Sequence, residues 1–571
     1  MRLTPLPYKH TLCGTCSATV FWAVGDLKRD SRNERMRTTI SSSMRGALLV
    51  VICASIPAST QHAKSASSTP RVTIDSGVLE GTHFSSDLRD GAFLGIPYAA
   101  AQVGALRWRP PQLPPSWQGV RKANEFGPAC PQLPSPWLPE MLGRKQMVTD
   151  EACLFLNVWT TNLHGAKKLP VMVWIHGGGN IEGSQEWPPL GPVLAKHGIV
   201  VVTINYRLGV FGYFSHPALT AESPYHSSGN YGLLDQMAAL QWVRRNIASF
   251  GGDPHRVTVF GASSGSLDIC DLLASPLADG LFQGAILQSG VCVDGLAPTL
   301  DHQEAAGKRI ATDLGVADDS GALAHLRAIP ADELLQRASE EKNVDFNPVL
   351  DGWVFREQPA IVFEKGHQAR IPVVVGSNAD EVSIFKSPLV GGKSRNPGTV
   401  EEYHHWLIEN FGAHAEQVFE AYSAKTDRDV AEAVLNLQSD HEFGFGSRLL
   451  AREVAASGQR AYLYNFTYVG SGPFEVLGAF HSEESILLSK QYWTSWVSSP
   501  DDERLSNILI AYWVQFASTG TPDGEGLPRW PRYDPKTDEA QELGRHVGQI
   551  KALRAARFKV FDEMLQEELH P

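Results

Sequence analysis

The chain has 571 residues, of which 43% are hydrophobic and 20% charged, so a large core can be buried and a disordered or fibrous protein is excluded. Its 50 Lys and Arg against 62 Asp and Glu give a formal net charge of −12, which phosphate backbones and anionic membranes repel. Nucleic-acid binding is therefore excluded as a main role. The longest apolar run near the N-terminus, 47–54, is far shorter than the roughly 20 residues of a spanning helix, and we expect no transmembrane anchor.

Residues 1–65 have the pattern of a leader with a secretory signal. Basic residues precede a short apolar segment at 46–56, and small residues follow it. Such signals begin close to the initiator methionine, so the true start is expected at Met36 or Met44. The pattern predicts a secreted or periplasmic protein.

The chain contains seven cysteines, and an oxidising compartment favours disulfides among those of the exported part. Cys130 and Cys153 enclose a loop whose closure would stabilise the fold by about 3 kcal/mol, and we predict that they are bonded. For Cys270 and Cys292 a second disulfide and two buried thiols both stay open.

Strand-like and helix-like segments alternate after residue 71 without a long linker or an internal repeat, which indicates one α/β unit. Unbroken Val- and Ile-rich runs are typical of strands that are buried on both faces of a parallel sheet. A helix is predicted over 233–250, and further helices within 300–345 and 395–455 are expected above the sheet edge where ligands bind. The predicted strands are 171–176, 199–206, 257–263, 284–289, 372–378 and 461–467.

A Gly-x-Ser-x-Gly sequence, 261–265, stands between a predicted strand and a helical run. In that context glycines relieve crowding at a sharp turn, which lifts the central Ser263 above the sheet as a nucleophile. A five-residue pattern also arises by chance, and a serine that caps the following helix is the structural alternative.

A second glycine cluster, His176-Gly-Gly-Gly-Asn180, follows another predicted strand. Consecutive glycines let backbone N–H groups approach the oxyanion that forms during acyl transfer. Phosphate binding is disfavoured, because the dinucleotide G-x-G-x-x-G spacing is absent and no P-loop lysine follows. A purely structural turn stays as an alternative.

These motifs belong to longer stretches in which the chain resembles the type-B carboxylesterase family of α/β hydrolases, which includes para-nitrobenzyl esterases, fungal lipases and cholinesterases. The resemblance implies an α/β-hydrolase fold: a mostly parallel central sheet, helices on both faces and helical insertions over the active site. It also implies a single catalytic domain over 66–571. The matching segments include 77–84, 94–99, 106–112, 152–159, 176–180, 205–214, 229–265, 285–290, 376–381, 478–484 and 511–534.

Position by position, the resemblance implies that Ser263 is the nucleophile, His481 the general base and Glu381 the acid that orients the imidazole. It implies a serine esterase that acts through an acyl-enzyme on small to medium carboxylic esters, with no metal and no cofactor. A lipase, or a hydrolase of a specialised ester, carbamate or toxin, is the alternative of the same fold. A non-catalytic binding module is the alternative of another class.

Further positions match residues that support catalysis in the family. The oxyanion donors implied are the N–H groups of Gly178, Gly179 and Ser264, and Ser289 matches a serine that hydrogen-bonds near the triad acid. Cys130 and Cys153 match the family's N-terminal disulfide, and a buried ion pair is implied beside it, between Arg107 and Glu151.

Other interpretations of these residues stay open on the sequence alone. His481 and Glu484, three positions apart, have the spacing of two metal ligands on a helix, and Asp380 is a rival to Glu381 as the acid. Ala262 stands where the family usually has Glu, which disfavours a choline-ester specialist because the site loses a negative charge. Trp187, Phe443 and Phe445 are predicted as pocket walls, with core packing as the alternative.

Overall fold

The computed structural model describes residues 69–135, 147–317, 319–341, 345–387, 396–472, 474–490 and 499–571. The predicted leader and both predicted start sites lie outside the described residues. From Thr69 to Pro571 the chain forms one compact unit. Within the ranges given, no helix is both long enough and apolar enough to cross a lipid bilayer.

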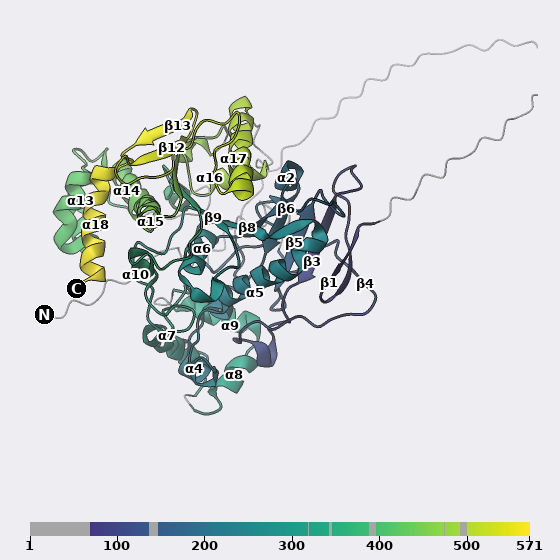
Figure 1. Ribbon diagram of the computed structural model, residues 1–571. Coiled ribbons are helices and arrows are strands. Elements are labelled where there is room, and N and C mark those ends of the chain that lie inside the picture. Colours follow the sequence, from purple (N-terminus) through teal and green to yellow (C-terminus); the bar gives the residue numbers. More distant parts are fainter. Residues whose placement is uncertain are drawn as a thin grey trace, which may run out of the picture. The chain divides into compact units, whose positions relative to one another are not determined.

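Ten strands of the described chain form one sheet, and helices pack on both of its faces (Figure 1). Neighbouring strands are parallel from β12 through β7, whereas β13, β5 and β3 run antiparallel to their neighbours. The prediction of a mostly parallel sheet covered by helices is therefore confirmed. In spatial order the strands are β13 (Val547–Lys551), β12 (Glu539–Leu543), β11 (Ala461–Phe466), β10 (Val373–Asn378), β9 (Gly284–Gln288), β8 (Gly252–Ala262), β6 (Leu169–Ile175), β7 (Val200–Ile204), β5 (Phe155–Thr160) and β3 (Gly91–Pro97).

The six strands predicted from apolar runs are β6 to β11, and only β8 differs clearly from its predicted start. It begins at Gly252 rather than at Val257. The side chains of 253–256 are partly or fully exposed, so the apolar pattern begins only where the strand enters the core. The predicted helix over 233–250 is α5 (Tyr231–Asn246), followed by the 3-10 turn η3 (Ile247–Phe250).

Alternating side chains of the central strand β6 divide the core into two layers. Val173 and Ile175 pack in the layer that also contains α5 and α6 (Ser264–Ala274). Met172 and Trp174 point to the opposite face, into the layer of α17 (Pro500–Thr519). This period of two is the geometry of a strand that is buried on both sides.

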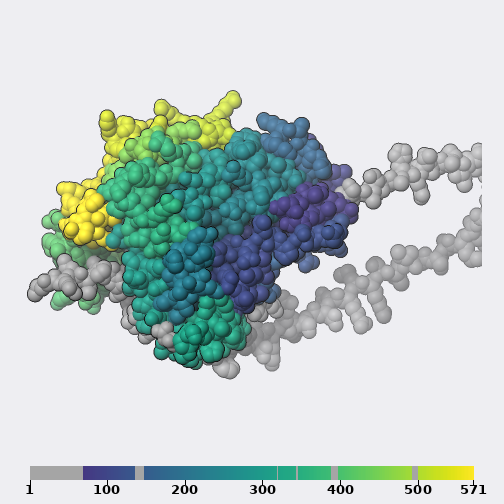
Figure 2. Space-filling view, turned by 60° about the horizontal axis from the view of Figure 1, so that its bottom comes forward, coloured from purple at the N-terminus to yellow at the C-terminus, as the bar shows by residue number. Residues whose placement is uncertain are grey.

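A separate small sheet comprises β1 (Arg71–Ile74), β2 (Gly77–Glu80) and β4 (Val120–Lys122). In the view of Figure 2, the first described residues (purple) lie at the right and the last residues (yellow) at the left. Residues from the middle of the sequence (teal and green) lie between them. Apart from short 3-10 helices, the remaining helices of the described chain are α2 (Gly191–Leu194), α3 (Gly209–Gly212), α4 (Pro217–Glu222), α7 (Leu300–Asp313), α8 (Ala322–Ala328), α9 (Ala331–Glu340), α10 (Pro359–Glu364), α11 (Ser383–Lys386), α12 (Val400–Phe411), α13 (Ala415–Ala421), α14 (Val430–Ser439), the π-helix η7 (Asp440–Gly444), α15 (Phe445–Ala456), α16 (Glu483–Ser489) and α18 (Ala555–Leu569).

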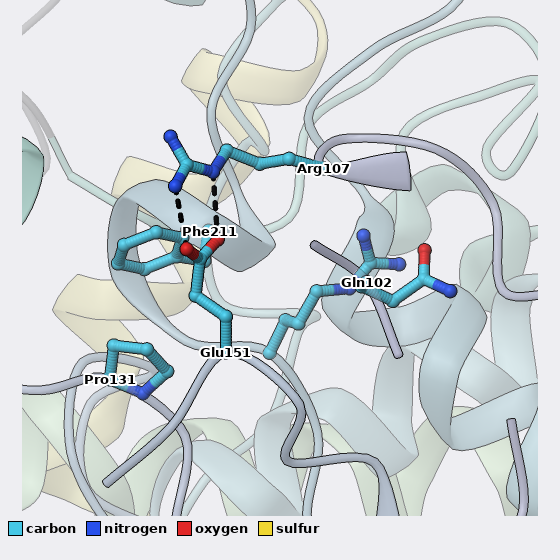
Figure 3. A pocket seen from close by; sticks show the side chains of 6 residues that line it. Gln102, Arg107, Pro131, Glu151 and Phe211 are labelled. Atoms are coloured by element: carbon cyan, nitrogen blue, oxygen red, sulfur yellow. Dashed lines mark hydrogen bonds and ion pairs between the residues drawn. The ribbon is translucent and has the colours of Figure 1, made fainter. Parts of the chain in front are cut away.

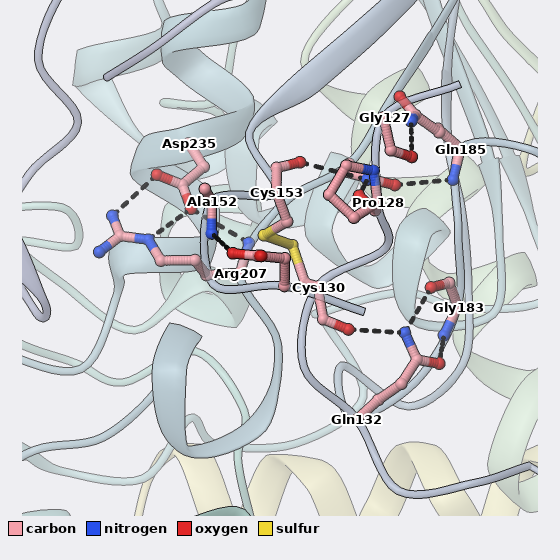
Figure 4. The surroundings of a disulfide bond; sticks show 12 residues. Gly127, Pro128, Cys130, Gln132, Ala152, Cys153, Gly183, Gln185, Arg207 and Asp235 are labelled. Atoms are coloured by element: carbon pink, nitrogen blue, oxygen red, sulfur yellow. Dashed lines mark hydrogen bonds and ion pairs between the residues drawn. A yellow bond between two sulfur atoms is a disulfide. The ribbon is translucent and has the colours of Figure 1, made fainter. Parts of the chain in front are cut away.

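The predicted disulfide between Cys130 and Cys153 is present, with an S–S distance of 1.98 Å (Figure 4). Beside it the side-chain amide of Gln132 donates to the carbonyl of Gly183 at 2.8 Å, and its Oε1 accepts from the Gly183 N–H at 2.9 Å. The disulfide loop is thereby held against the segment that follows the glycine cluster.

The predicted ion pair between Arg107 and Glu151 also forms, in a two-pronged arrangement (Figure 3). Nε and Nη2 of Arg107 donate to the two Glu151 oxygens at 2.7 and 2.6 Å, and Nη1 donates to the carbonyl of Ile329 at 2.8 Å. Arg107 is only 5% exposed, so removing either partner would leave a buried charge uncompensated. The pair therefore joins segments that are far apart in the sequence.

The sequence left open whether Cys270 and Cys292 are paired. They are bonded to each other, and the disulfide joins α6 to the segment after β9. Replacing both by alanine is expected to lower the free energy of unfolding by about 3 kcal/mol, because the bond restricts the unfolded chain. Urea unfolding of the oxidised double variant, which keeps the Cys130–Cys153 bond, beside the oxidised wild type measures this loss. Equal midpoints for the two proteins, or two free thiols at these positions in a peptide map, would contradict the assignment.

Candidate active site

The Gly-x-Ser-x-Gly sequence forms the sharp turn from β8 into α6. Ser263 has φ 57° and ψ −130°, a backbone conformation that L residues rarely adopt. A Cβ on Gly265 would lie 2.2 Å from the carbonyl oxygen of Ile175, and one on Gly261 would lie 2.6 Å from the same atom, so only glycine fits at both places. The Ser263 side chain makes no capping hydrogen bond to α6, which excludes the helix-cap alternative.

The glycine cluster after β6 lies directly against this turn. A Cβ on Gly177 would lie 2.9 Å from the Cβ of Ser263. Gly178 and Gly179 have φ of 117° and 62°, which glycine adopts without strain. Among the described residues, no acceptor is found for the N–H groups of Gly178, Gly179 or Ser264, so all three are available as oxyanion donors.

Glu381 and His481, which are 100 residues apart in the sequence, are hydrogen-bonded to each other. Nδ1–H of His481 donates to Oε2 of Glu381 at 2.5 Å, while Oε1 of Glu381 accepts from the N–H of Asn378 at 2.6 Å. The rival acid Asp380 instead accepts from the N–H of Ala479 at 2.9 Å. Glu381, and not Asp380, is therefore the carboxylate that is hydrogen-bonded to the imidazole.

Strand register places Ser263 and Glu381 at the same edge of the sheet, and His481 joins them through its hydrogen bond to Glu381. Ser263 follows Ala262, which pairs with Gln288 of β9, and β9 in turn pairs with β10, which ends just before Glu381. Nε2 of His481 is buried and makes no hydrogen bond within the described part of the chain, so the Ser263 hydroxyl is not bonded to it in this structure. Such contacts are often long in unliganded enzymes and tighten when substrate binds.

The hydrogen bond expected from the Ser289 side chain is not formed. Its hydroxyl is buried and has no partner among the described residues, while its N–H donates to the carbonyl of Gly376 at 2.9 Å. The support role of Ser289 therefore stays a prediction, and it is not carried by a side-chain hydrogen bond here.

A second buried carboxyl group, Glu484, lies close to Glu381 and was missed as a site residue. Its oxygens accept from the side-chain amides of Gln288, at 2.8 Å, and Asn378, at 2.7 Å. Burial, together with the nearby charge of Glu381, raises the pKa of Glu484. The hydrogen bonds of Glu484 therefore fix the segment that carries His481.

His481 and Glu484 belong to no cluster of three metal-ligating side chains within the described ranges.

Two aromatic rings flank the imidazole of His481. The ring centroids of Phe385 and Phe443 lie 5.1 and 4.9 Å from that of His481. Phe443 belongs to the π-helix η7, an element that is frequent at functional sites. Phe445 instead packs against Phe558 in the core, so its prediction as a wall is wrong. These rings place apolar surface beside the imidazole.

The third aromatic candidate, Trp187, packs against a small satellite cluster of the core. This cluster comprises Leu477, Phe480 and Ile486, and Ile384 packs against it as well. Because Phe480 directly precedes His481, Trp187 packs against the segment that carries the imidazole. Its predicted place in a pocket wall stays a prediction.

Glu442 directly precedes Phe443, and Lys386 directly follows Phe385. Burial raises the pKa of Glu442 to about 7, although the nearby charges of Lys386 and His481 act in the opposite direction. Burial also lowers the pKa of Lys386 to about 8. The carboxyl group of Glu442 therefore gains or loses its proton near neutral pH.

This shift predicts a pH-dependent stability. Because folding raises the pKa of Glu442 from 4.5 to about 7, its favourable contribution is complete below pH 4.5 and is lost as the pH rises through 7. Glu442→Gln cannot titrate at this position. Its free energy of unfolding, relative to that of the wild type, is therefore expected to rise by up to about 3 kcal/mol between pH 5 and pH 8. Urea unfolding at both pH values measures it, with the exposed Glu432→Gln as the matched control. Equal pH dependence in wild type and Glu442→Gln would refute the assignment.

Comparisons with known proteins indicate one family. The profile of the Carboxylesterase family matches residues 68–561. The fumonisin B1 esterase of Sphingopyxis macrogoltabida is 39% identical over 489 residues, which cover 84% of this chain and 87% of that protein. The liver carboxylesterase of Sus scrofa is 33% identical, covering 91% and 97% of the two chains.

Solved structures show the same fold. A para-nitrobenzyl (PNB) esterase superimposes with a TM-score of 0.73 and 30% identity, covering 86% of this chain and all of that chain. A thermophilic PNB esterase gives a TM-score of 0.75, also at 30% identity and with the same coverage. The fold is thus the α/β-hydrolase fold, as predicted. The chain belongs to the carboxylesterase family and is an enzyme that hydrolyses carboxylic esters.

Proposed function

We propose that Ser263, His481 and Glu381 are the catalytic triad of this esterase. Nε2 of His481 removes the proton of the Ser263 hydroxyl as its oxygen attacks the ester carbonyl carbon. The imidazolium then protonates the departing alkoxide, and an acyl-enzyme remains on Ser263. Water, activated in the same way, releases the acid. The observation that carries the proposal is the Glu381–His481 hydrogen bond at the sheet edge where Ser263 occupies its strained turn.

The oxyanion of each tetrahedral intermediate is proposed to accept hydrogen bonds from the N–H groups of Gly178, Gly179 and Ser264. These donors lie on the loop after β6 and at the first turn of α6, which flank Ser263. Because they are fixed by the fold before the reaction, they stabilise developing charge without reorganisation. No residue of this scheme requires a metal or an organic cofactor, and turnover is expected to survive dialysis against a chelator.

The substrate class is proposed from the apolar surface beside the imidazole. Phe385 and Phe443 favour small to medium esters with an apolar portion. A specialised ester is the second candidate, because the 39% identical relative is a fumonisin B1 esterase. Comparing kcat/KM over para-nitrophenyl esters of rising acyl length, emulsified triglyceride and fumonisin B1 separates these possibilities. A general esterase gives its highest value on short para-nitrophenyl esters, a lipase on triglyceride and a specialised enzyme on fumonisin B1.

Export to the periplasm or the medium is also proposed. Two disulfides occur in the described chain, and such bonds persist in oxidising compartments. The basic and apolar pattern within 1–65 supplies the signal. N-terminal sequencing of the exported protein is expected to begin near residue 66. A mature chain that retains 1–35 would contradict the proposed start sites.

A further inference from the structure

The residue after the three glycines, Asn180, is tied into a buried hydrogen-bond network. It is fully buried and has φ 58°, so the left-handed backbone of Gly178 and Gly179 continues through it. Its Oδ1 accepts from the Tyr206 hydroxyl at 3.2 Å, and its carbonyl accepts from the N–H of Gly209 at 2.6 Å. Its Nδ2 donates to Oδ1 of Asp268 at 3.0 Å.

Asp268 lies on α6, the helix that begins directly after Ser263. Its carboxyl group is fully buried, and its other oxygen accepts from the Tyr213 hydroxyl at 3.3 Å and from the side-chain amide of Gln236. Among the described residues, no Lys, Arg or His forms an ion pair with it. Burial raises its pKa to about 7, against the effect of its three donors.

A buried carboxyl group without a cation opposes folding, because its charged form loses hydration. Stability alone therefore gives no reason for an acid at position 268. The contact with Asn180 does give a reason, since it joins the two elements that supply the oxyanion donors. Gly178 and Gly179 lie on the loop after β6, whereas Ser264 lies on α6 with Asp268. Donors of this kind act only if their relative positions are held within a fraction of an ångström.

We propose that Asp268 is a positioning residue, which fixes the oxyanion loop against the nucleophile helix by holding the side chain of Asn180. It touches neither the substrate nor the reacting atoms. The inference rests on the proposed roles of Ser263, Gly178 and Gly179. It predicts that the contact matters in the transition state, where the oxyanion is charged, and little in the ground state.

The test compares Asp268→Leu with Asp268→Asn. Leucine cannot accept from Asn180, so kcat on para-nitrophenyl acetate is expected to fall about 10- to 100-fold with KM changed less than about twofold. Asparagine still offers a carbonyl oxygen to Asn180 and is expected to keep kcat within about threefold of the wild type. The affinity of a trifluoromethyl ketone, which forms a tetrahedral adduct, is expected to fall in Asp268→Leu by the same factor as kcat.

The matched control is Asp271→Asn, which alters another buried acid on α6. Its carboxyl group makes no hydrogen bond within the described ranges and acts on Asp268 only through its charge, so the contact with Asn180 is kept and kcat and KM are expected to stay as in the wild type. If Asp268→Leu does not fold, Asn180→Gly decides the question. Glycine suits φ 58° and removes the side chain that Asp268 holds. The Tyr206 hydroxyl also loses its contact with Asn180 but still donates to the carbonyl of His176 at 2.8 Å, so the same loss of kcat is expected.

If Asn180→Gly, or a folded Asp268→Leu, keeps kcat within twofold of the wild type, the inference is overturned. It also fails if Asp268→Leu raises KM and leaves kcat unchanged, or if Asp268→Asn loses as much activity as leucine. Failure of the proposed catalytic scheme has another signature, because Ser263→Ala would then remain active. The two failures are therefore distinguishable.

Discussion

Replacing Ser263 by alanine is expected to reduce kcat for any carboxylic ester by about 10⁴-fold or more, because the variant has no nucleophile to form an acyl-enzyme. The exchange removes one partly exposed oxygen that makes no capping hydrogen bond, so the fold should be unaffected. Steady-state kinetics and thermal unfolding of the purified variant measure both expectations. A variant that keeps more than a few percent of the wild-type rate would overturn the assignment of the nucleophile.

Glycine at the same position supplies a control that separates strain from chemistry. Ser263 holds φ 57°, and glycine adopts such values without the Cβ penalty. Ser263→Gly should therefore be as inactive as alanine yet more stable than alanine, by about 1 kcal/mol. Urea unfolding of the two inactive variants measures the difference. Equal stability would show that the turn stores no strain at this residue.

The second large effect is expected from Glu381→Gln, with a loss of about 10³- to 10⁴-fold in kcat. The N–H of Asn378 needs an acceptor, so the glutamine oxygen remains with Asn378 and its NH₂ group faces Nδ1 of His481. Nδ1 must then accept rather than donate, which places the proton on Nε2. The imidazole is left in the tautomer that cannot remove the Ser263 proton.

Asp380→Asn is the matched control for this experiment. The change also neutralises a carboxylate, one position earlier, and an asparagine oxygen can still accept from the N–H of Ala479. Its kcat is expected to stay within about threefold of the wild type. If instead Asp380→Asn lost activity and Glu381→Gln retained it, the acid would have to be reassigned to Asp380.

Local sequence patterns were sufficient for the elements that position Ser263. Unbroken apolar runs located β6 to β11, because strands buried on both faces carry no polar alternation. The glycines at 261 and 265 marked the turn, since no Cβ fits beside the Ile175 carbonyl oxygen. The acid and the base came only from resemblance to the family. Nothing in the local sequence distinguishes Glu381 from Asp380, and their different partners arise from the tertiary fold.

The remaining features of the site depend on contacts between distant segments. Glu484 was considered only as a metal ligand, because its partners Gln288, on β9, and Asn378, on β10, lie far from it in the sequence. Phe385 and Phe443 meet at His481 from elements that lie far apart in the sequence. The sequence shows that these residues are apolar, but it does not show which face of each helix lies against the imidazole. For the same reason Phe445 could not be separated from Phe443 before the structure placed it in the core.

Covalent labelling with a fluorophosphonate tests the assignment of the reactive serine most directly. Mass spectrometry of the labelled wild type is expected to show one adduct per chain, on the peptide that contains Ser263, with loss of activity proportional to labelling. Ser263→Ala should take up no label, and Glu381→Gln should be labelled far more slowly. An adduct on a different residue, or an active enzyme that resists labelling, would contradict the proposed chemistry.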